Sequence, residues 1–184
     1  DGARLQKHGV DIVHTLPGVG ENLQDHYVAR FCCRAKSVET FNERARGWRL
    51  GWEILRYAAT RQGLLTMAPG NVSASVKIMP GVATPDIQFA FAPASYVDGQ
   101  LGVLDNFPGM TCGVWQHRPA SRGSIHIASM DPEQQPRIQP NYLSDSIDQE
   151  TLVGGLKYAR QLFAQPALAK YVDAETVPGP DVQT

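Results

Sequence analysis

The stretch His26–Lys36, with the sequence HYVARFCCRAK, decides the fold, because its residues alternate with a period of two. One face of the extended chain is formed by Tyr27, Ala29, Phe31 and Cys33, and the other by Val28, Arg30, Cys32 and Arg34. The alternation predicts a strand whose first face covers a core and whose second face meets solvent or a ligand. We interpret the two adjacent cysteines of this strand as structural residues rather than reactive ones.

Four further segments have strand-like patterns: Val72–Ile78, Asp86–Ala92, Met110–His117 and Ser124–Ser129. Several of them follow one another without a helical crossover, which favours an antiparallel sheet. In the last segment we expect Ile125 and Ile127 to point inward and His126 to be solvated. A loop rich in Gly, Asp and Asn, Ser95–Pro108, has a length typical of functional or mobile segments.

Two long helices are expected from apolar residues at helical spacing. The first, Asn42–Gln62, carries a stripe that we interpret as buried core: Trp48, Trp52, Leu55 and Ala59. The second, Ser146–Gln165, carries the stripe Leu152, Leu156, Ala159 and Phe163. A short helix at Ala3–His8 and a short strand at Val10–Thr15 precede them. Together these elements predict an α+β fold, an antiparallel β-sheet of about five to six strands backed by helices.

Composition restricts the class of partner. The 184 residues include 17 basic and 18 acidic side chains, with a net charge of -1 and both signs scattered along the chain. This balance predicts no binding to nucleic acid or to an anionic membrane surface, and favours a small molecule or a protein surface. No apolar run approaches the roughly 20 residues of a membrane span. Three cysteines, two of them adjacent, argue against a disulfide framework and favour a reducing, cytoplasmic location.

The chain carries no complete motif for catalysis or metal binding. Gly18-Val19-Gly20 follows a predicted strand, but the third glycine of the dinucleotide fingerprint G-x-G-x-x-G is replaced by Leu23. No C-x-x-C motif, no His pair at helical spacing and no Ser-His-Asp order is present. We therefore predict no catalytic residue and no metal site in this chain, only a domain that is suited to binding a ligand.

Three blocks resemble signatures of the glucose–methanol–choline (GMC) oxidoreductase family. The first is LPGVGENLQDH at residues 16–26, and the second is RPASRG at residues 118–123, followed by IHI at 125–127 and Asp131-Pro132. The third is PNYLS at residues 140–144, which leads into the second long helix. The blocks follow the order of the family and span nearly the whole chain, so the resemblance implies the family's substrate-binding domain.

The resemblance implies that the chain is part of a longer enzyme, similar to choline dehydrogenase-like alcohol dehydrogenases. Family members bind FAD through an N-terminal Rossmann-like domain and oxidise an alcohol with a His in a C-terminal segment. Residues 1–24 would then be the connecting tail of the FAD-binding domain, and residues 25–184 the substrate-binding domain. We expect the chain alone to bind no FAD and to be inactive, because the fingerprint is missing and the catalytic His would follow Thr184. A start at Asp1, without Met, agrees with this expectation.

The resemblance also implies site residues. Asn22, Asp25 and His26 correspond to the family's loop near the flavin, and a role limited to locking the domain junction is an equal alternative. Choline-using members place a Glu two residues after the Asp-His pair, where this chain has Val28. Because valine offers no counter-charge to a trimethylammonium group, the expected substrate is an uncharged aliphatic or aromatic alcohol, with Val28 as a substrate-binding residue.

A stand-alone, non-catalytic binding or interaction module on the same scaffold is the alternative function. If the chain instead belongs to an enzyme, its partners are the alcohol and the remaining FAD-binding and C-terminal segments. The sequence leaves the electron acceptor open between oxygen and a quinone-like carrier.

Overall fold

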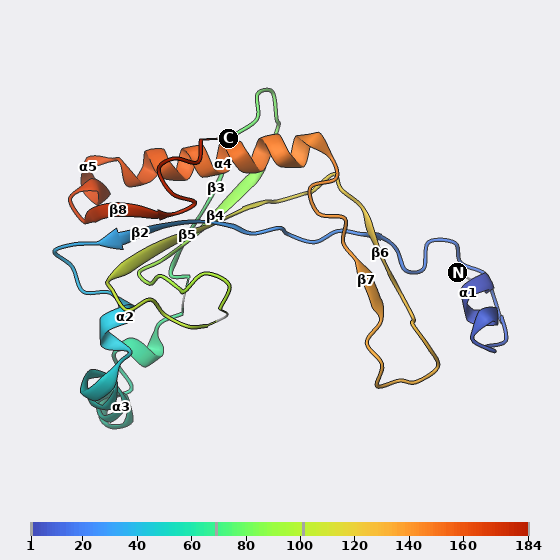
Figure 1. Cartoon of the computed structure of the whole chain (residues 1–184), viewed down its shortest axis with the longest axis horizontal. Helices are drawn as coiled ribbons and strands as arrows, with labels where there is room; N and C mark the ends of the chain where they lie inside the picture. The colour runs from blue at the N-terminus through green and yellow to red at the C-terminus, as the bar shows by residue number, and fades with distance from the viewer. Residues whose placement is uncertain (1, 69, 101, 184) are drawn as a thin grey trace. The chain divides into compact units, whose positions relative to one another are not determined.

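The computed structural model describes residues 2–68, 70–100 and 102–183, which form two compact units. Unit 1 contains the chain up to Tyr27 and residues 116–150, and unit 2 contains residues 28–115 and the chain from Thr151 onward. The two sheets are antiparallel and accompanied by helices, which confirms the predicted α+β class (Figure 1). Both chain ends, Asp1 and Thr184, and one residue of the predicted loop, Leu101, lie outside the described residues.

Unit 2 contains a five-stranded sheet with the strand order β3-β4-β5-β2-β8. Its strands are β2 (Ala29–Ala35), β3 (Val72–Val76), β4 (Ile87–Ala92), β5 (Gly109–Gln116) and β8 (Val172–Val177). The first four confirm the strands predicted between residues 26 and 117, with ends that differ by a few residues. The edge strand β8 was not predicted, because Asp173 and Glu175 interrupt its apolar pattern.

The helix α4 (Ser146–Phe163) lies along one face of this sheet from residue 151 onward (Figure 1). At Gly155 its backbone comes so close that a Cβ would lie 2.7 Å from Val114 and 3.1 Å from Ile87. The ring of Phe163 packs edge-on against Phe31, with the ring centroids 4.8 Å apart. The stripe predicted for this helix is buried at three of its four positions, Leu152, Ala159 and Phe163. The short helix α5 (Pro166–Ala169) follows.

The opposite face of β2 is also partly buried, which corrects the prediction that it meets only solvent or a ligand. Cys32 on this face is 4% exposed, and its sulfur lies 3.4 Å from the hydroxyl of Thr111. The cause is the loop between β4 and β5, which lies over this face. The guanidinium of Arg34, for example, stacks on the ring of Phe107 at 4.5 Å.

The loop Ser95–Pro108 is confirmed as an irregular connection over its described residues, and Asn42 ties its two ends together. The Asn42 amide nitrogen donates to the carbonyl oxygens of Ser95, at 2.9 Å, and Asp105, at 3.1 Å. The Asn42 amide oxygen accepts from the backbone N–H of Ser95 at 2.9 Å. This buried side chain therefore closes the loop at its base.

The three cysteines are buried and free. Burial raises the pKa of Cys33 and of Cys112 to about 12, and it also raises the pKa of Cys32. A thiol with so high a pKa is uncharged at neutral pH and is a poor nucleophile. The structural role predicted for the adjacent pair agrees with this environment.

The first long helix differs from its prediction in extent and in orientation. Instead of one helix at Asn42–Gln62 there are two, α2 (Phe41–Arg44) and α3 (Gly47–Thr60), followed by the 3-10 turn η1 (Leu64–Thr66). The predicted core stripe of this segment is wrong. Its large members are 80%, 62% and 63% exposed at Trp48, Trp52 and Leu55, respectively.

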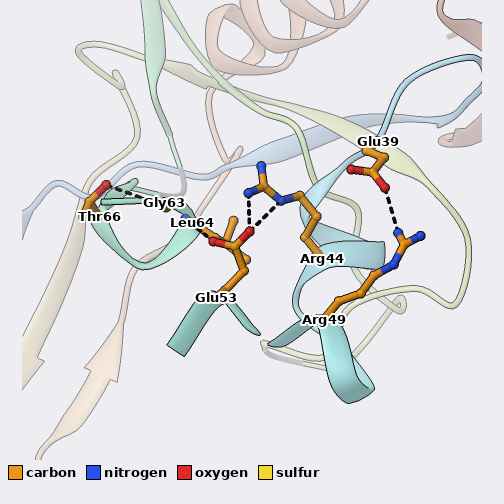
Figure 2. A network of polar contacts seen from close by, with 7 residues as sticks. All are labelled: Glu39, Arg44, Arg49, Glu53, Gly63, Leu64 and Thr66. Atoms are coloured by element: carbon orange, nitrogen blue, oxygen red, sulfur yellow. Dashed lines mark hydrogen bonds and ion pairs between the residues drawn. The ribbon is translucent and has the colours of Figure 1, made fainter. Parts of the chain in front are cut away.

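A glutamate explains the orientation of α3, because Glu53 is the buried residue of this helix (Figure 2). Its carboxylate accepts hydrogen bonds from the guanidinium of Arg44 and, at 2.9 Å, from the backbone N–H of Leu64. The Leu64 amide and the Arg44 guanidinium lower the pKa of Glu53, so it stays charged. Gly63, with a φ of 101°, leaves room for this carboxylate, since a Cβ there would lie 2.6 Å from its Oε2.

Unit 1 contains a three-stranded sheet with the order β1-β6-β7, formed by β1 (Glu21–Leu23), β6 (Gly123–His126) and β7 (Arg137–Gln139). The prediction that residues 124–129 join the larger sheet is therefore wrong. The helix α1 (Gly2–Lys7) confirms the short N-terminal helix. The strand predicted at Val10–Thr15 is not formed: this segment pairs with no strand among the described residues, and Val13 is fully exposed.

The orientation of β6 is the reverse of the prediction. His126 is buried at 7% exposure, whereas Ile125 and Ile127 are 40% and 42% exposed. The His126 Nε2 lies 3.0 Å from a carboxylate oxygen of Glu21 on β1, so a polar partner on the neighbouring strand accompanies the buried imidazole. Gly20 packs directly against this strand, since a Cβ there would lie 2.4 Å from the carbonyl oxygen of Ile125.

The difference in burial between the apolar stripes of α4 and α3 can be tested by replacing one large side chain on each helix with alanine. Phe163→Ala removes a ring that is 4% exposed, so we expect the free energy of unfolding to fall by about 3–5 kcal/mol. Trp52→Ala, at a position that is 62% exposed, should change it by no more than about 0.5 kcal/mol. Urea denaturation followed by circular dichroism measures both values, and equal losses would contradict the observed orientations.

Candidate functional site

The residues predicted to contact a cofactor are exposed and lie in unit 1, with Asn22 inside β1 and Asp25 and His26 just after it. The Asp25 carboxylate accepts hydrogen bonds from the hydroxyl of Tyr142 and, at 2.9 Å, from the backbone N–H of His26. The His26 Nε2 lies 3.2 Å from the carbonyl oxygen of His117, so this nitrogen carries the proton, because a carbonyl only accepts. Asp25 therefore holds the backbone of His26, and the carbonyl oxygen of His117 holds its imidazole.

The neighbouring residues hold this segment in place. The Gln24 side chain donates to the carbonyl oxygen of Pro119 at 2.7 Å, and the rings of Tyr27 and Tyr142 lie 5.5 Å apart. Asn22 has a φ of 60°, a left-handed conformation that asparagine tolerates, and its side chain is exposed. The three sequence blocks at residues 16–26, 118–123 and 140–144 thus contact one another within unit 1.

The contact between Asp25 and Tyr142 shifts the pKa values of both side chains. The Tyr142 hydroxyl, followed by the backbone N–H of His26, lowers the pKa of Asp25. The same hydrogen bond to Asp25 raises the pKa of Tyr142, because it favours the protonated phenol. At neutral pH the pair is therefore a carboxylate and a neutral phenol, which is suited to positioning rather than to proton exchange.

Asp148 is a structurally important residue that no motif indicated. In the first turn of α4 its two oxygens accept from the backbone N–H groups of Ala120 and Ser121, each at 2.8 Å, and from the Ser121 hydroxyl at 2.5 Å. Burial acts to raise the pKa of Asp148, but hydrogen bonds, first of all from the Ser121 hydroxyl, outweigh it and lower the pKa. The only available signal was an acidic residue in the first turn of a predicted helix.

The RPASRG block is a packed turn. One guanidinium nitrogen of Arg122 donates to the carbonyl oxygens of Pro119 and Ala120, at 2.7 and 2.8 Å. Gly123 lets the neighbouring strand β7 pack closely against it, because a Cβ at Gly123 would lie 2.1 Å from the carbonyl oxygen of Gln139. The arginine and the glycine of this block therefore act within the turn.

Val28, the predicted substrate-binding residue, is the first residue of unit 2 and precedes β2. It is 49% exposed and lies on the face of the strand opposite to Phe31, away from α4. Gly113 on β5 lies beside it: a Cβ at Gly113 would be 3.6 Å from Val28 and 3.5 Å from the ring of Trp115. The lack of a side chain at Gly113 leaves space next to Val28.

In the part of the chain that the structure describes, no three His, Cys, Asp or Glu side chains come together as a possible metal site. No helix within the described ranges combines the length and the apolar character that a membrane crossing requires.

Sequence comparison identifies the class of protein that this fold represents. Residues 119–184 match the family described as GMC oxidoreductase. An alcohol dehydrogenase (acceptor) of Pseudomonas putida is 37% identical over 98% of this chain and 33% of its own length. The mitochondrial choline dehydrogenase of Homo sapiens is 35% identical over 98% of this chain and 30% of its own length. The chain is thus related in sequence to GMC oxidoreductases, and it spans about one third of the length of these relatives.

Solved structures agree on the fold. A formate oxidase matches with a TM-score of 0.84 and 19% identity, over 99% of this chain and 36% of its own. An FAD-dependent oxidoreductase from Chaetomium thermophilum matches with a TM-score of 0.73 and 16% identity, over 99% of this chain and 37% of its own. These likenesses confirm the predicted scaffold.

The Asp25–Tyr142 contact predicts a measurable titration. Tyr142→Phe keeps the ring but removes the hydroxyl, so the pKa of Asp25 should rise toward its usual value of 3.8. Because the folded-state pKa is lowered, this carboxylate stabilises the fold above its unfolded pKa, and that contribution disappears as the pH falls through the folded pKa. The wild type should therefore lose more stability than the variant on acidification below about pH 4.

Carboxyl NMR titration of Asp25 measures the shift, and urea unfolding at several pH values measures the stability. Tyr27→Phe is the matched control, since its hydroxyl makes no hydrogen bond with Asp25. An Asp25 pKa that is the same in wild type and in Tyr142→Phe would show that the hydroxyl contact does not exist in solution.

Proposed function

We propose that this chain is the substrate-facing part of an FAD-dependent alcohol oxidoreductase. Residues 1–24 form the connecting tail of the FAD-binding domain in this proposal, and residues 25–184 form the substrate-binding domain. FAD supplies the redox chemistry when bound, accepting the hydride of the alcohol carbon. The nucleotide fingerprint and the His that takes the hydroxyl proton belong to other segments of the same enzyme. The sequence relationship to GMC oxidoreductases and the shared scaffold support this assignment.

The residues of this chain fit one edge of an FAD site and not its phosphate site. Gly20 is packed against β6, because a Cβ there would lie 2.4 Å from the carbonyl oxygen of Ile125, whereas Gly18 is open. The Gly18–Gly20 turn leads into the strand β1 and not into a helix whose N-terminus could bind a pyrophosphate. Asn22 and His26 are exposed polar residues, and they would hold the nearest part of the cofactor. Asp25 would keep their segment in position through Tyr142.

The single observation that carries the substrate proposal is the half-exposed sheet surface at Val28. The other face of this sheet is covered by α4, whereas Val28 lies next to Gly113 and the ring of Trp115. Such an apolar surface binds an uncharged alcohol through buried area, at about 25 cal/mol per Å². A cation such as choline would find no carboxylate at position 28 and would lose a charge-assisted contact. An uncharged aliphatic or aromatic alcohol is therefore the proposed substrate.

A cytoplasmic location completes the proposal. The three cysteines are free, which agrees with a reducing compartment.

Substitution at Val28 tests the substrate class in the full-length enzyme. We expect uncharged primary alcohols with several carbons to have a higher kcat/KM than choline. Val28→Glu should narrow the difference, because it supplies a counter-charge to trimethylammonium. Steady-state kinetics with choline and with a neutral alcohol of similar size measure the effect, and Val28→Gln is the uncharged control. A wild-type preference for choline of tenfold or more, about 1.4 kcal/mol, would contradict the role of Val28.

Flavin binding and turnover test whether cofactor binding and catalysis require other segments of the enzyme. The 184-residue chain on its own should be colourless and inactive on alcohols even with added FAD, because it lacks the fingerprint and the catalytic His. Visible absorbance after desalting and a dye-linked turnover assay measure these properties. Stoichiometric flavin retention or measurable turnover by this chain would reject the proposal.

A further inference from the structure

The helix α3 presents a stripe of large apolar side chains to solvent, whereas the side towards its own unit carries the buried Glu53 between the half-buried Leu50 and Tyr57. Trp48, Trp52 and Leu55, at i, i+4 and i+7, are all more than half exposed. On the other side, Glu53 is bound by Arg44 and by the backbone of η1 (Figure 2). A surface helix of a globular protein normally has the opposite orientation, and an apolar patch of this kind marks an interaction site. We call these three exposed residues the α3 stripe.

The surroundings of the α3 stripe are cationic, so the net charge of -1 of the whole chain, which predicted no binding to an anionic membrane surface, does not describe this local surface. Residues 44–61 contain five arginines and one acidic residue, Glu53. Arg44 is bound to Glu53, and Arg49 pairs with Glu39 at 2.8 Å (Figure 2). The other three arginines have no carboxylate in an ion pair within the described chain; they are Arg46, Arg56 and Arg61.

We propose that α3 is an interfacial helix that binds an anionic phospholipid surface. Tryptophan is the side chain best suited to the boundary between headgroups and acyl chains, and leucine inserts beside it. Arginines at the rim bind phosphate headgroups and keep their stems on the apolar surface. The 14 residues of α3 extend about 21 Å, less than the roughly 30 Å of a bilayer core, so the helix lies in the membrane plane.

The charge distinguishes lipid from a second copy of the chain as the occupant. A symmetric dimer through the α3 stripe would place the same cationic rim on both sides of the interface. Like charges would then approach one another in a partly desolvated contact, which opposes association. Anionic headgroups instead complement both features of this surface, the apolar stripe and the arginines.

Vesicle co-sedimentation tests the proposal, with the protein purified in its longest natural form. The vesicles contain phosphatidylcholine alone or with roughly one third phosphatidylglycerol. We expect at least about tenfold tighter binding to the anionic vesicles, with affinity falling as salt is raised. The double variant Trp48→Ser/Trp52→Ser should lose about tenfold or more in affinity. The double variant Arg56→Gln/Arg61→Gln should lose the preference for anionic lipid.

Val13→Ser is the matched control, because Val13 is a fully exposed apolar residue outside α3. Fluorescence gives a second readout that does not depend on the double variants. The contribution of Trp48 and Trp52 is the difference between the emission of the wild type and that of the single variants Trp48→Phe and Trp52→Phe. Their emission should shift to the blue with anionic vesicles and should be quenched by brominated lipid.

Three results would overturn the proposal. The first is no binding of the wild type to either vesicle, which would also be the outcome if other segments of the enzyme cover the stripe. The second is binding that the tryptophan double variant leaves unchanged. The third is a dimer that this variant abolishes, with no vesicle binding, which would assign the stripe to a second copy. None of these results affects the Val28 kinetics, so the proposed function is tested separately.

Discussion

The close approach of α4 to the five-stranded sheet is the contact on which the arrangement of unit 2 depends. Two successive glycines make it possible: a Cβ at Gly154 would lie 2.5 Å from Ile78, and one at Gly155 would lie 2.7 Å from Val114. Glycine within a helix costs about 1 kcal/mol relative to alanine, and the burial of Phe163 offsets that cost. The face that carries Val28 is covered only in part, by the loop between β4 and β5, so the half-exposed Val28 remains open to a ligand.

In unit 1 the three sequence blocks are held together by contacts with one another and with the first turn of α4. Asp25 binds Tyr142, Gln24 binds the backbone of Pro119, and Asp148 binds the turn at Ser121. These contacts fix a segment in which the side chains of Asn22 and His26 are exposed. Such a rigid segment suits a role at the edge of a cofactor site, since preorganised contacts lose little entropy on binding.

The helix α3 shows that an amphipathic pattern alone does not tell which side of a helix is buried. Its pattern requires one apolar side, and the usual interpretation places that side in the core. A charged group reversed the outcome, because Glu53 finds two donors on its own unit, the guanidinium of Arg44 and the N–H of Leu64. The same reversal occurs on β6, where His126 is buried beside Glu21 and the isoleucines on either side are exposed.

The sequence by itself determined the class of fold, four of the five strands of the larger sheet, the helix α4 and the relationship to GMC oxidoreductases, because these follow from local periodicity and from contiguous motifs. For the candidate site, the sequence proposed Asn22, Asp25, His26 and Val28, whose roles stay predictions, and it did not indicate the hydrogen-bond partners Tyr142 and Asp148. Only the tertiary structure decided which strand joins which sheet and which side of α3 is buried. These outcomes depend on contacts between different elements, such as the hydrogen bonds of Glu53 with Arg44 and Leu64 and the pairing of β1 with β6, and the periodicity of a single element does not encode them.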